Sequence, residues 1–161
     1  MKKLFSAVAA VSMMTNAAVA AEVESKAGAK IVAPLQVSNV SALYFGTVAP
    51  SLTADDKVVV SPAGAKTCGA ELTCLSDDHT AAKFEVTGQA EASYTIDLPS
   101  TIRIANGNGE SMTVTDFQGS KTSGKLSSGA DDFTVGGTLA VAANQAAGDY
   151  TGTFTVAVEY K

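Results

Sequence analysis

The chain of 161 residues has no tryptophan, a single histidine and only two cysteines. One histidine and two cysteines leave few soft ligands for a zinc site, so no metal and no cofactor is expected. Acidic residues outnumber basic ones, which gives a formal net charge of −5. Such a surface repels phosphate backbones and anionic lipid. We therefore expect neither nucleic acid nor a membrane surface as a partner.

Long apolar runs are also missing, except near the N-terminus. A basic start at Met1–Lys3 is followed by an apolar stretch at 4–14 that is too short to span a bilayer. Ala18-Val19-Ala20 then fits the small-x-small pattern that signal peptidase recognises. This pattern favours a signal peptide at residues 1–20 over a buried N-terminal helix. We expect a bacterial protein that passes through the periplasm to the cell surface or medium, without membrane insertion of the mature chain.

The mature chain is long enough for one domain and is rich in residues that suit short strands and tight turns. Ala21–Lys30 is polar, and we interpret it as a flexible N-terminal arm. Residues 31–161 are predicted to form an all-β domain, an antiparallel sandwich of the immunoglobulin-like kind with about nine short strands. The predicted apolar runs are 31–37, 43–48, 57–60, 84–86, 94–98, 102–104, 112–114, 133–135, 139–141 and the terminal segment.

Two features of these runs constrain the sheet. Pro34 interrupts the first run, and because proline cannot donate to a ladder, that strand is expected to lie at an edge or to bend. Asn106-Gly107-Asn108-Gly109 separates two β-like runs, and Asn-Gly tolerates positive φ, so a hairpin is predicted there. No helix follows these glycines, which argues against a phosphate-binding loop.

The last fourteen residues, Gly148–Lys161, show the strongest strand pattern. Side chains alternate between faces along a strand, and here one parity is apolar while the other carries mostly threonine and glutamate. The segment either completes a sheet or is offered to a partner. The residues predicted to serve strand complementation are Gly148, Tyr150, Phe154, Val156, Val158 and Tyr160.

Cys68 and Cys74 are predicted to form a disulfide, the default for an exported protein. The alternative is a metal pair joined by His79, but zinc sites usually space their cysteines more closely. Asp77-Asp78-His79 with a serine would be needed for a catalytic triad; we interpret it as a polar loop, and no enzyme activity is expected. The paired aspartates at 55–56, 77–78 and 131–132 are interpreted as solvated turn charges rather than calcium ligands.

Three stretches carry a family resemblance. Val32–Val48, Val58–Gly64 and Leu139–Tyr160 resemble a family of exported bacterial β-domains of unknown function, DUF4402. The most specific part is Asn-Gln-x-Ala-Gly-x-Tyr-x-Gly-x-Phe. The C-terminus also resembles the terminal strand of chaperone–usher pilins, which have a glycine fourteenth from the end and a tyrosine next to last. Gly148 and Tyr160 occupy these positions.

The pilin resemblance implies an incomplete sandwich whose missing strand is lent by a periplasmic chaperone and later supplied by the N-terminal arm of the next subunit. The expected partners are therefore copies of the chain and a chaperone and usher. The arm has only Val23 as a large apolar residue, so the candidate donor segment borrows Ile31, Leu35 and Val37. The expected function is that of a structural surface protein, a fimbrial subunit. The alternative is a self-contained adhesin or coat protein that binds a ligand such as a glycan.

Overall fold

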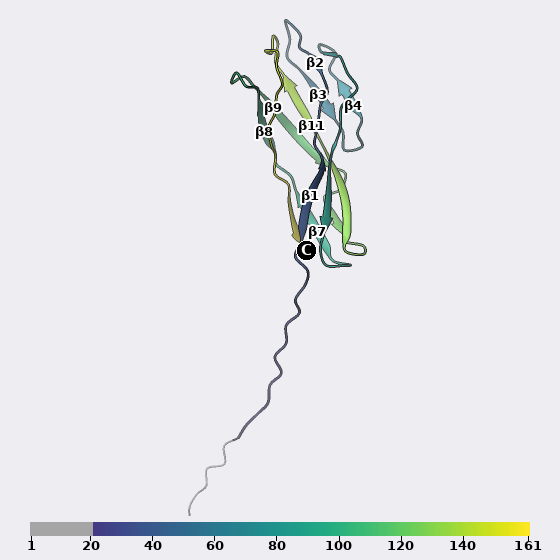
Figure 1. Cartoon of the computed structure of the whole chain (residues 1–161), viewed down its shortest axis with the longest axis vertical. Coiled ribbons are helices and arrows are strands. Elements are labelled where there is room, and N and C mark those ends of the chain that lie inside the picture. The colour runs from purple at the N-terminus through teal and green to yellow at the C-terminus, as the bar shows by residue number, and fades with distance from the viewer. Residues whose placement is uncertain (1–20) are drawn as a thin grey trace, which may run out of the picture. The chain divides into compact units, whose positions relative to one another are not determined.

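The computed structural model describes residues 21–161; the predicted signal peptide lies outside the described residues. Contacts divide the chain into two units, 1–30 and 31–161. In the first unit, residues 21–30 are exposed and belong to no strand or helix. The second unit contains all of the described secondary structure (Figure 1).

Ile31–Lys161 is built from antiparallel strands, and no helix occurs among the described residues, which confirms the all-β fold class. The strands are β1 (Gln36–Ser41), β2 (Val48–Ala49), β3 (Asp56–Val60), β4 (Lys66–Cys68), β5 (Thr73–Cys74), β6 (Ala82–Thr87), β7 (Ser93–Asp97), β8 (Thr101–Ala105), β9 (Ser111–Gly119), β10 (Ser123–Lys125), β11 (Ala130–Val141) and β12 (Ala157–Tyr160).

The largest sheet is organised around β11. One edge of its first half pairs with β6, and its second half pairs with β9 on one side and β3 on the other. β1 ends the sheet beyond β6, and β4 ends it beyond β3. The sequence predicted two short strands where β11 is continuous. Gly136 explains the join, because a Cβ there would lie 2.2 Å from the carbonyl oxygen of Val60.

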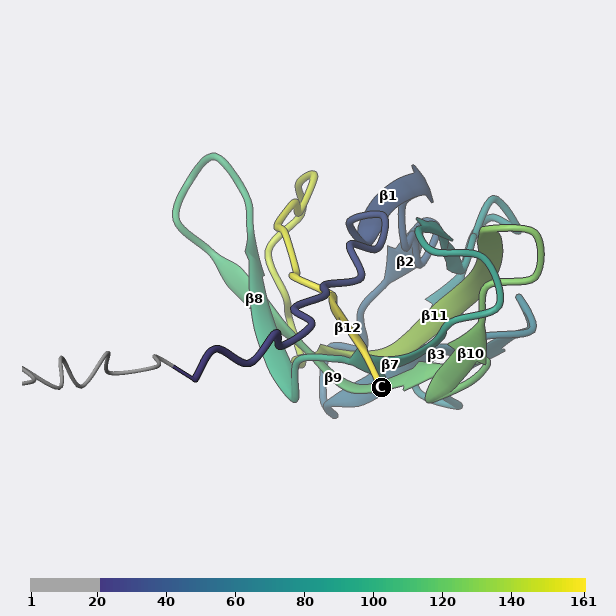
Figure 2. The same ribbon diagram turned by 90° about the horizontal axis from the view of Figure 1, so that it is seen from below.

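A three-stranded sheet, β10-β7-β12, faces the large sheet, and a small ribbon is formed by β2 and β5. Figure 2 shows the large sheet curling around the interior, which gives a β-sandwich-like fold. Two clusters fill it. The β3 core consists of Phe45, Val58, Val60, Leu72, Val114, Leu139 and Val141. The β6 core consists of Ala82, Phe84, Val86, Tyr94, Leu126, Phe133 and Val135.

The predicted hairpin is present between β8 and β9. The Asn106 side-chain oxygen accepts the backbone N–H groups of Asn108 and Glu110 at 3.0 and 2.9 Å. Gly109 closes the turn with a φ of +91°, a conformation that costs glycine little. This turn chemistry is local, and the sequence therefore predicted it correctly.

The first strand begins later than expected. The run at 31–37 alternates in sequence and was predicted as a strand. In the structure, β1 starts only at Gln36, after Pro34. Its place at the end of the large sheet agrees with the prediction of an edge strand. The run at 43–48 was predicted as a strand, but the structure forms one only at Val48–Ala49, with Tyr44 making a single bridge to Thr80.

Candidate functional site

The C-terminal segment keeps its predicted two faces. The apolar residues Phe154, Val156, Val158 and Tyr160 are half-buried and pack against the β6 core. Phe154 lies edge-on to Phe84, with ring centroids 6.0 Å apart. The intervening residues Thr153, Thr155 and Glu159 are exposed. The period of two therefore holds from Thr153 to Lys161, whereas Gly152, on the apolar parity, is exposed.

The expected long ladder, in contrast, is interrupted. Ala157–Tyr160 pairs with β7, and Thr151 makes an isolated bridge to Ala105 at the end of β8, whereas Gly152–Val156 lies in no ladder. From Thr151 to Ala157 the chain advances six residues, while the opposite strand spans eight from Asp97 to Ala105. The opposite strand therefore has two additional residues. They lie at the junction of β7 and β8, where Pro99 has no N–H to donate.

The start of the segment is fixed by a tyrosine and a glycine. The Tyr150 hydroxyl donates to the carbonyl oxygen of Ala146 at 2.7 Å and accepts from the side-chain amide of Gln145 at 2.9 Å. Gly152 lies so close to β8 that a Cβ would stand 2.7 Å from the Arg103 carbonyl oxygen. The sequence analysis did not select Gly152 as a site residue, and its place on the apolar parity was the only signal.

Tyr160 ties the other end of the segment to the start of the domain. Its hydroxyl donates to the carbonyl oxygen of Ala33 at 2.8 Å and accepts the backbone N–H of Gln89 at 2.7 Å. Leu35 follows directly and packs against the β6 core. The chain entering β1 is thereby held next to the C-terminus.

The three residues of the candidate donor segment have different environments. Leu35 contributes to the packing of its own domain, and Val37 lies in β1 opposite Val86. Ile31 is 93% exposed. The structure therefore does not present the three as one free strand, and of the three only Ile31 lies outside both β1 and the packing around the β6 core.

β4 and β10 end their sheets, and so do β1 and β12. We call the outer edge of β1 and that of the segment Gly152–Tyr160 the free edges. β1 pairs only with β6, and β12 pairs only with β7. The two strands lie near one another as the last strands of different sheets (Figure 2). Val37 stands opposite the fully buried Val86 and on the same face, yet it remains 36% exposed. Within residues 21–161, the side chain of Val37 is therefore only partly covered.

The free edges therefore combine two kinds of binding group. Each edge offers backbone N–H and C=O groups in an extended arrangement, and half-buried apolar side chains lie between them. An added strand would satisfy the backbone groups and would place every second side chain over the apolar row. The arrangement suits recognition of an extended polypeptide.

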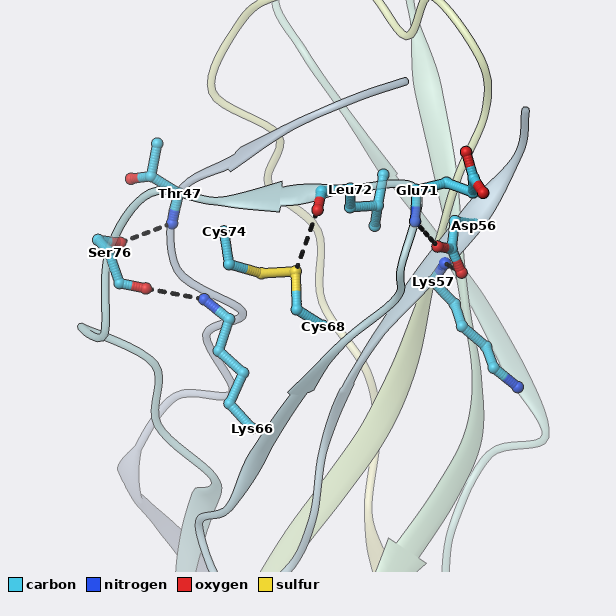
Figure 3. The surroundings of a disulfide bond; sticks show 9 residues. All are labelled: Thr47, Asp56, Lys57, Lys66, Cys68, Glu71, Leu72, Cys74 and Ser76. Atoms are coloured by element: carbon cyan, nitrogen blue, oxygen red, sulfur yellow. Dashed lines mark hydrogen bonds between the residues drawn. A yellow bond between two sulfur atoms is a disulfide. The ribbon is translucent and has the colours of Figure 1, made fainter. Parts of the chain in front are cut away.

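The disulfide lies in a different part of the domain (Figure 3). Cys68 ends β4 and Cys74 lies in β5, and their bond joins the small ribbon to the edge of the large sheet, as predicted. Asp56 supports the enclosed loop by accepting the backbone N–H of Glu71 at 2.8 Å. The loop is short, so the bond is worth roughly 2 kcal/mol by chain entropy. Its role is structural.

The Asp77-Asp78-His79 loop does not assemble a triad. The His79 Nε2 atom lies 3.0 Å from the carbonyl oxygen of Gly64, and the Ser76 hydroxyl donates to Asp78 instead. Lys66 donates to the carbonyl oxygen of Ser76 at 2.8 Å (Figure 3). Within residues 21–161, no three His, Cys, Asp or Glu side chains are grouped as metal ligands would be.

A polar network closes the opposite side of the β6 core. The hydroxyl of the fully buried Tyr94 donates to Asp131 at 2.9 Å, and Lys121 forms an ion pair with the same carboxylate at 2.8 Å. Burial opposes ionisation of Asp131, but the hydrogen bonds from Lys121 and Tyr94 outweigh it and lower the pKa of this carboxyl. Burial and the neighbouring carboxylate raise the pKa of Tyr94.

These features define an antiparallel β-sandwich-like domain with two free edges at one side. Residues 35–160 match the family described as a domain of unknown function, DUF4402, and the chain belongs to this family. No curated protein and no solved structure is significantly similar to the chain. The match begins at Leu35, where the chain first packs against its own core, so the arm precedes it. Within residues 21–161, we find no helix with the length and apolarity needed to cross a bilayer.

Proposed function

We propose that the mature chain is a structural subunit of an exported surface polymer, a pilin-like fimbrial protein, and that subunits are joined by strand complementation at the free edges. The observation that carries the proposal is the half-covered apolar row of Phe154, Val156 and Val158 beside the unpaired backbone of β1. A strand added there would complete both sheets at once.

The composition of the free edges supports the same proposal. Soluble proteins usually protect an exposed edge with lysine, other charges or proline, because an unprotected edge pairs with other chains. β1 reads Gln-Val-Ser-Asn-Val-Ser, without charge or proline, and the segment Gly152–Tyr160 carries a single charge, at Glu159. These edges have little of the usual protection against pairing.

Export and a dedicated chaperone belong to this proposal. The N-terminal pattern of residues 1–20 supports secretion into the periplasm, where a disulfide is stable. An edge that pairs readily needs cover before assembly, because free edges lead to aggregation. A chaperone that lends a strand would supply this cover, and the second partner is another copy of the chain.

Hydrogen exchange on purified residues 21–161 tests the proposal. We expect a concentration-dependent ladder of oligomers by size exclusion, and in the oligomers slower exchange of the β1 and Gly152–Val156 amides than in the monomer. The amides of Thr138, Leu139 and Ala140 in β11, which lie between β3 and β9, serve as an internal control and should be protected in both states. A chain that stays monomeric at all concentrations, with the β1 and Gly152–Val156 amides unprotected, would contradict the proposal. It would favour the self-contained ligand-binding domain.

A further inference from the structure

We propose that Asn108 is a site of spontaneous covalent modification, at which the chain converts its own side-chain amide into an acid, and that Asn106 is protected from the same reaction. Both residues belong to the turn Asn106-Gly107-Asn108-Gly109 between β8 and β9, so the same Asn-Gly pair occurs twice in one hairpin. The reaction takes place within one chain and is independent of the proposed function.

The reaction joins two groups that are neighbours in the chain. The backbone nitrogen of the glycine attacks the side-chain carbonyl carbon of the asparagine and forms a C–N bond. The proton of the glycine N–H passes through solvent to the side-chain amide, which leaves as ammonia. Water then opens the resulting cyclic imide at either carbonyl and gives aspartate or isoaspartate. No group is oxidised or reduced. Glycine favours the attack, because it has no Cβ to hinder the approach of its nitrogen.

Asn108 has the environment that this reaction requires. Its side chain is exposed in the turn, and a Cβ on Gly109 would meet no atom within 4 Å, so water reaches both reacting groups. The Gly109 N–H donates to the backbone carbonyl oxygen of Asn106 at 3.3 Å. This distance is longer than in most N–H···O hydrogen bonds, so the attacking nitrogen is held only weakly.

Asn106 carries the same sequence signal in a different environment. A Cβ on Gly107 would also meet no atom within 4 Å, so the glycine that follows Asn106 is as open as Gly109. The Asn106 side chain, however, is only 9% exposed, and its Nδ2 atom, which would leave, is buried. Its oxygen accepts the N–H groups of Asn108 and Glu110. Ring closure would pull this oxygen away from both donors and leave them unpaired. We therefore expect reaction at Asn106 only when the hairpin opens.

The modification should change the tip of the hairpin without separating its strands. It adds one negative charge close to Glu110, and isoaspartate also adds a carbon to the backbone of the turn. Asn106 bonds Glu110 through both its side-chain oxygen and its backbone N–H, and these bonds span the modified residue without using its side chain. Modified chains should therefore keep the β8–β9 pairing and differ from unmodified chains in charge.

Ageing of purified residues 21–161 in heavy-oxygen water tests the proposal. Samples are kept in mildly alkaline buffer, either folded or unfolded in urea, and fragment mass spectra measure the label at each asparagine. In the folded chain we expect label at Asn108 and at least about tenfold less at Asn106, because two hydrogen bonds hold the Asn106 side chain. In urea we expect similar labelling at both positions, since the two Asn-Gly pairs are then equally open.

Asn108→Ser provides the matched control. This variant should keep the fold and lose the acidic form that accumulates in the original chain on ion exchange. Labelling of Asn106 that equals or exceeds that of Asn108 in the folded chain would overturn the protection of Asn106. A folded chain that stays unlabelled at Asn108, whatever happens in urea, would overturn the proposed site.

Discussion

β11 and the C-terminal segment Gly148–Lys161 both carry apolar side chains at alternate positions, and they differ in how completely they are paired. β11 pairs with β6 and then β3 along one edge and with β9 along the second half of the other, and its residues Phe133, Val135 and Leu139 are at most 5% exposed. The C-terminal segment has partners on one side only, at its two ends, and its apolar residues are half-buried. Alternation therefore determines which face turns inward, but it does not determine whether neighbouring strands close over that face.

The comparison also separates two kinds of stability. Side chains of β11 contribute to the domain by itself, whereas those of the C-terminal segment keep part of their apolar area exposed. Burial of apolar area is worth roughly 25 cal/mol per Å². Under the proposed function, the remaining area would be buried only on assembly. Substitutions in the two regions should thus affect folding and assembly to different degrees.

Phenylalanine truncation should give the largest effect and test the comparison directly. Phe133→Ala removes a ring that is 1% exposed and stacks on Phe84 with centroids 5.3 Å apart, so we expect a loss of about 3–5 kcal/mol in the free energy of unfolding. Phe154→Ala removes a half-buried ring and should cost clearly less. Urea unfolding measures both. Equal losses would mean that the C-terminal segment is packed as completely as β11.

A lysine scan of the segment should give the next largest effect. Val156→Lys places a charge over the β6 core, and we expect poor accumulation of the exported protein. Thr155→Lys, on the exposed face, should be tolerated. Immunoblots of the periplasmic and surface fractions compare the two. Equal sensitivity at the two positions would contradict the assigned faces.

Much of the fold follows from local features of the sequence. The β8–β9 hairpin was predicted because Asn106 and Gly109 determine the turn by themselves. The faces of the C-terminal segment were predicted because a period of two needs no knowledge of neighbours. The short strands β4, β5 and β10 were not predicted, since they contain no aliphatic or aromatic residue and their pairing comes from adjacent strands. The continuity of β11 depends on a close approach at Gly136 that only the packed structure reveals.

The candidate site could be predicted only in part, for a similar reason. The apolar parity of Phe154–Tyr160 was visible, but the unpaired stretch Gly152–Val156 lies opposite the connection between β7 and β8, which contains Pro99. The anchoring of Ala33 by Tyr160 joins opposite ends of the domain. Neither relation can be predicted from residues that are neighbours in the sequence. The free edges therefore could be identified only in the structure.

The polar network on β11 should show a pH dependence that the C-terminal segment lacks. The pKa of Asp131 is lowered in the folded protein, so its contribution to stability is present above the unfolded pKa of about 4 and is lost as the pH falls through the folded value. Asp131→Asn weakens the ion pair with Lys121, and we expect a loss of about 1–2 kcal/mol at pH 7.

Thermal unfolding from pH 7 to pH 2 measures this dependence. The difference between the original chain and Asp131→Asn should shrink at low pH, where the original carboxyl is protonated. Asp132→Asn is the matched control, because Asp132 faces Lys83 in a largely exposed pair that is worth little. A difference that stays constant over the whole range would show that the charge of Asp131 does not stabilise the fold.

The smallest effect is expected at the two tyrosines that hold the ends of the C-terminal segment. Tyr160→Phe keeps the ring but removes the hydroxyl that bonds Ala33 and Gln89, so we expect a loss of about 1 kcal/mol in the free energy of unfolding. Tyr150→Phe removes two hydrogen bonds of similar length at the other end and should cost a similar amount. By global stability alone, the two substitutions should be hard to distinguish.

Local exchange should distinguish them, because only Tyr160 reaches the entry to β1. In Tyr160→Phe the Gln89 amide loses its acceptor and should exchange faster, whereas in Tyr150→Phe its rate should not change. If Ala33 is the point where the free arm ends, release of its carbonyl should also move the first protease-sensitive bond from the arm toward Leu35. Unchanged exchange at Gln89 and unchanged cleavage in Tyr160→Phe would mean that the packing of Leu35, rather than the hydroxyl, sets the boundary between the arm and the domain.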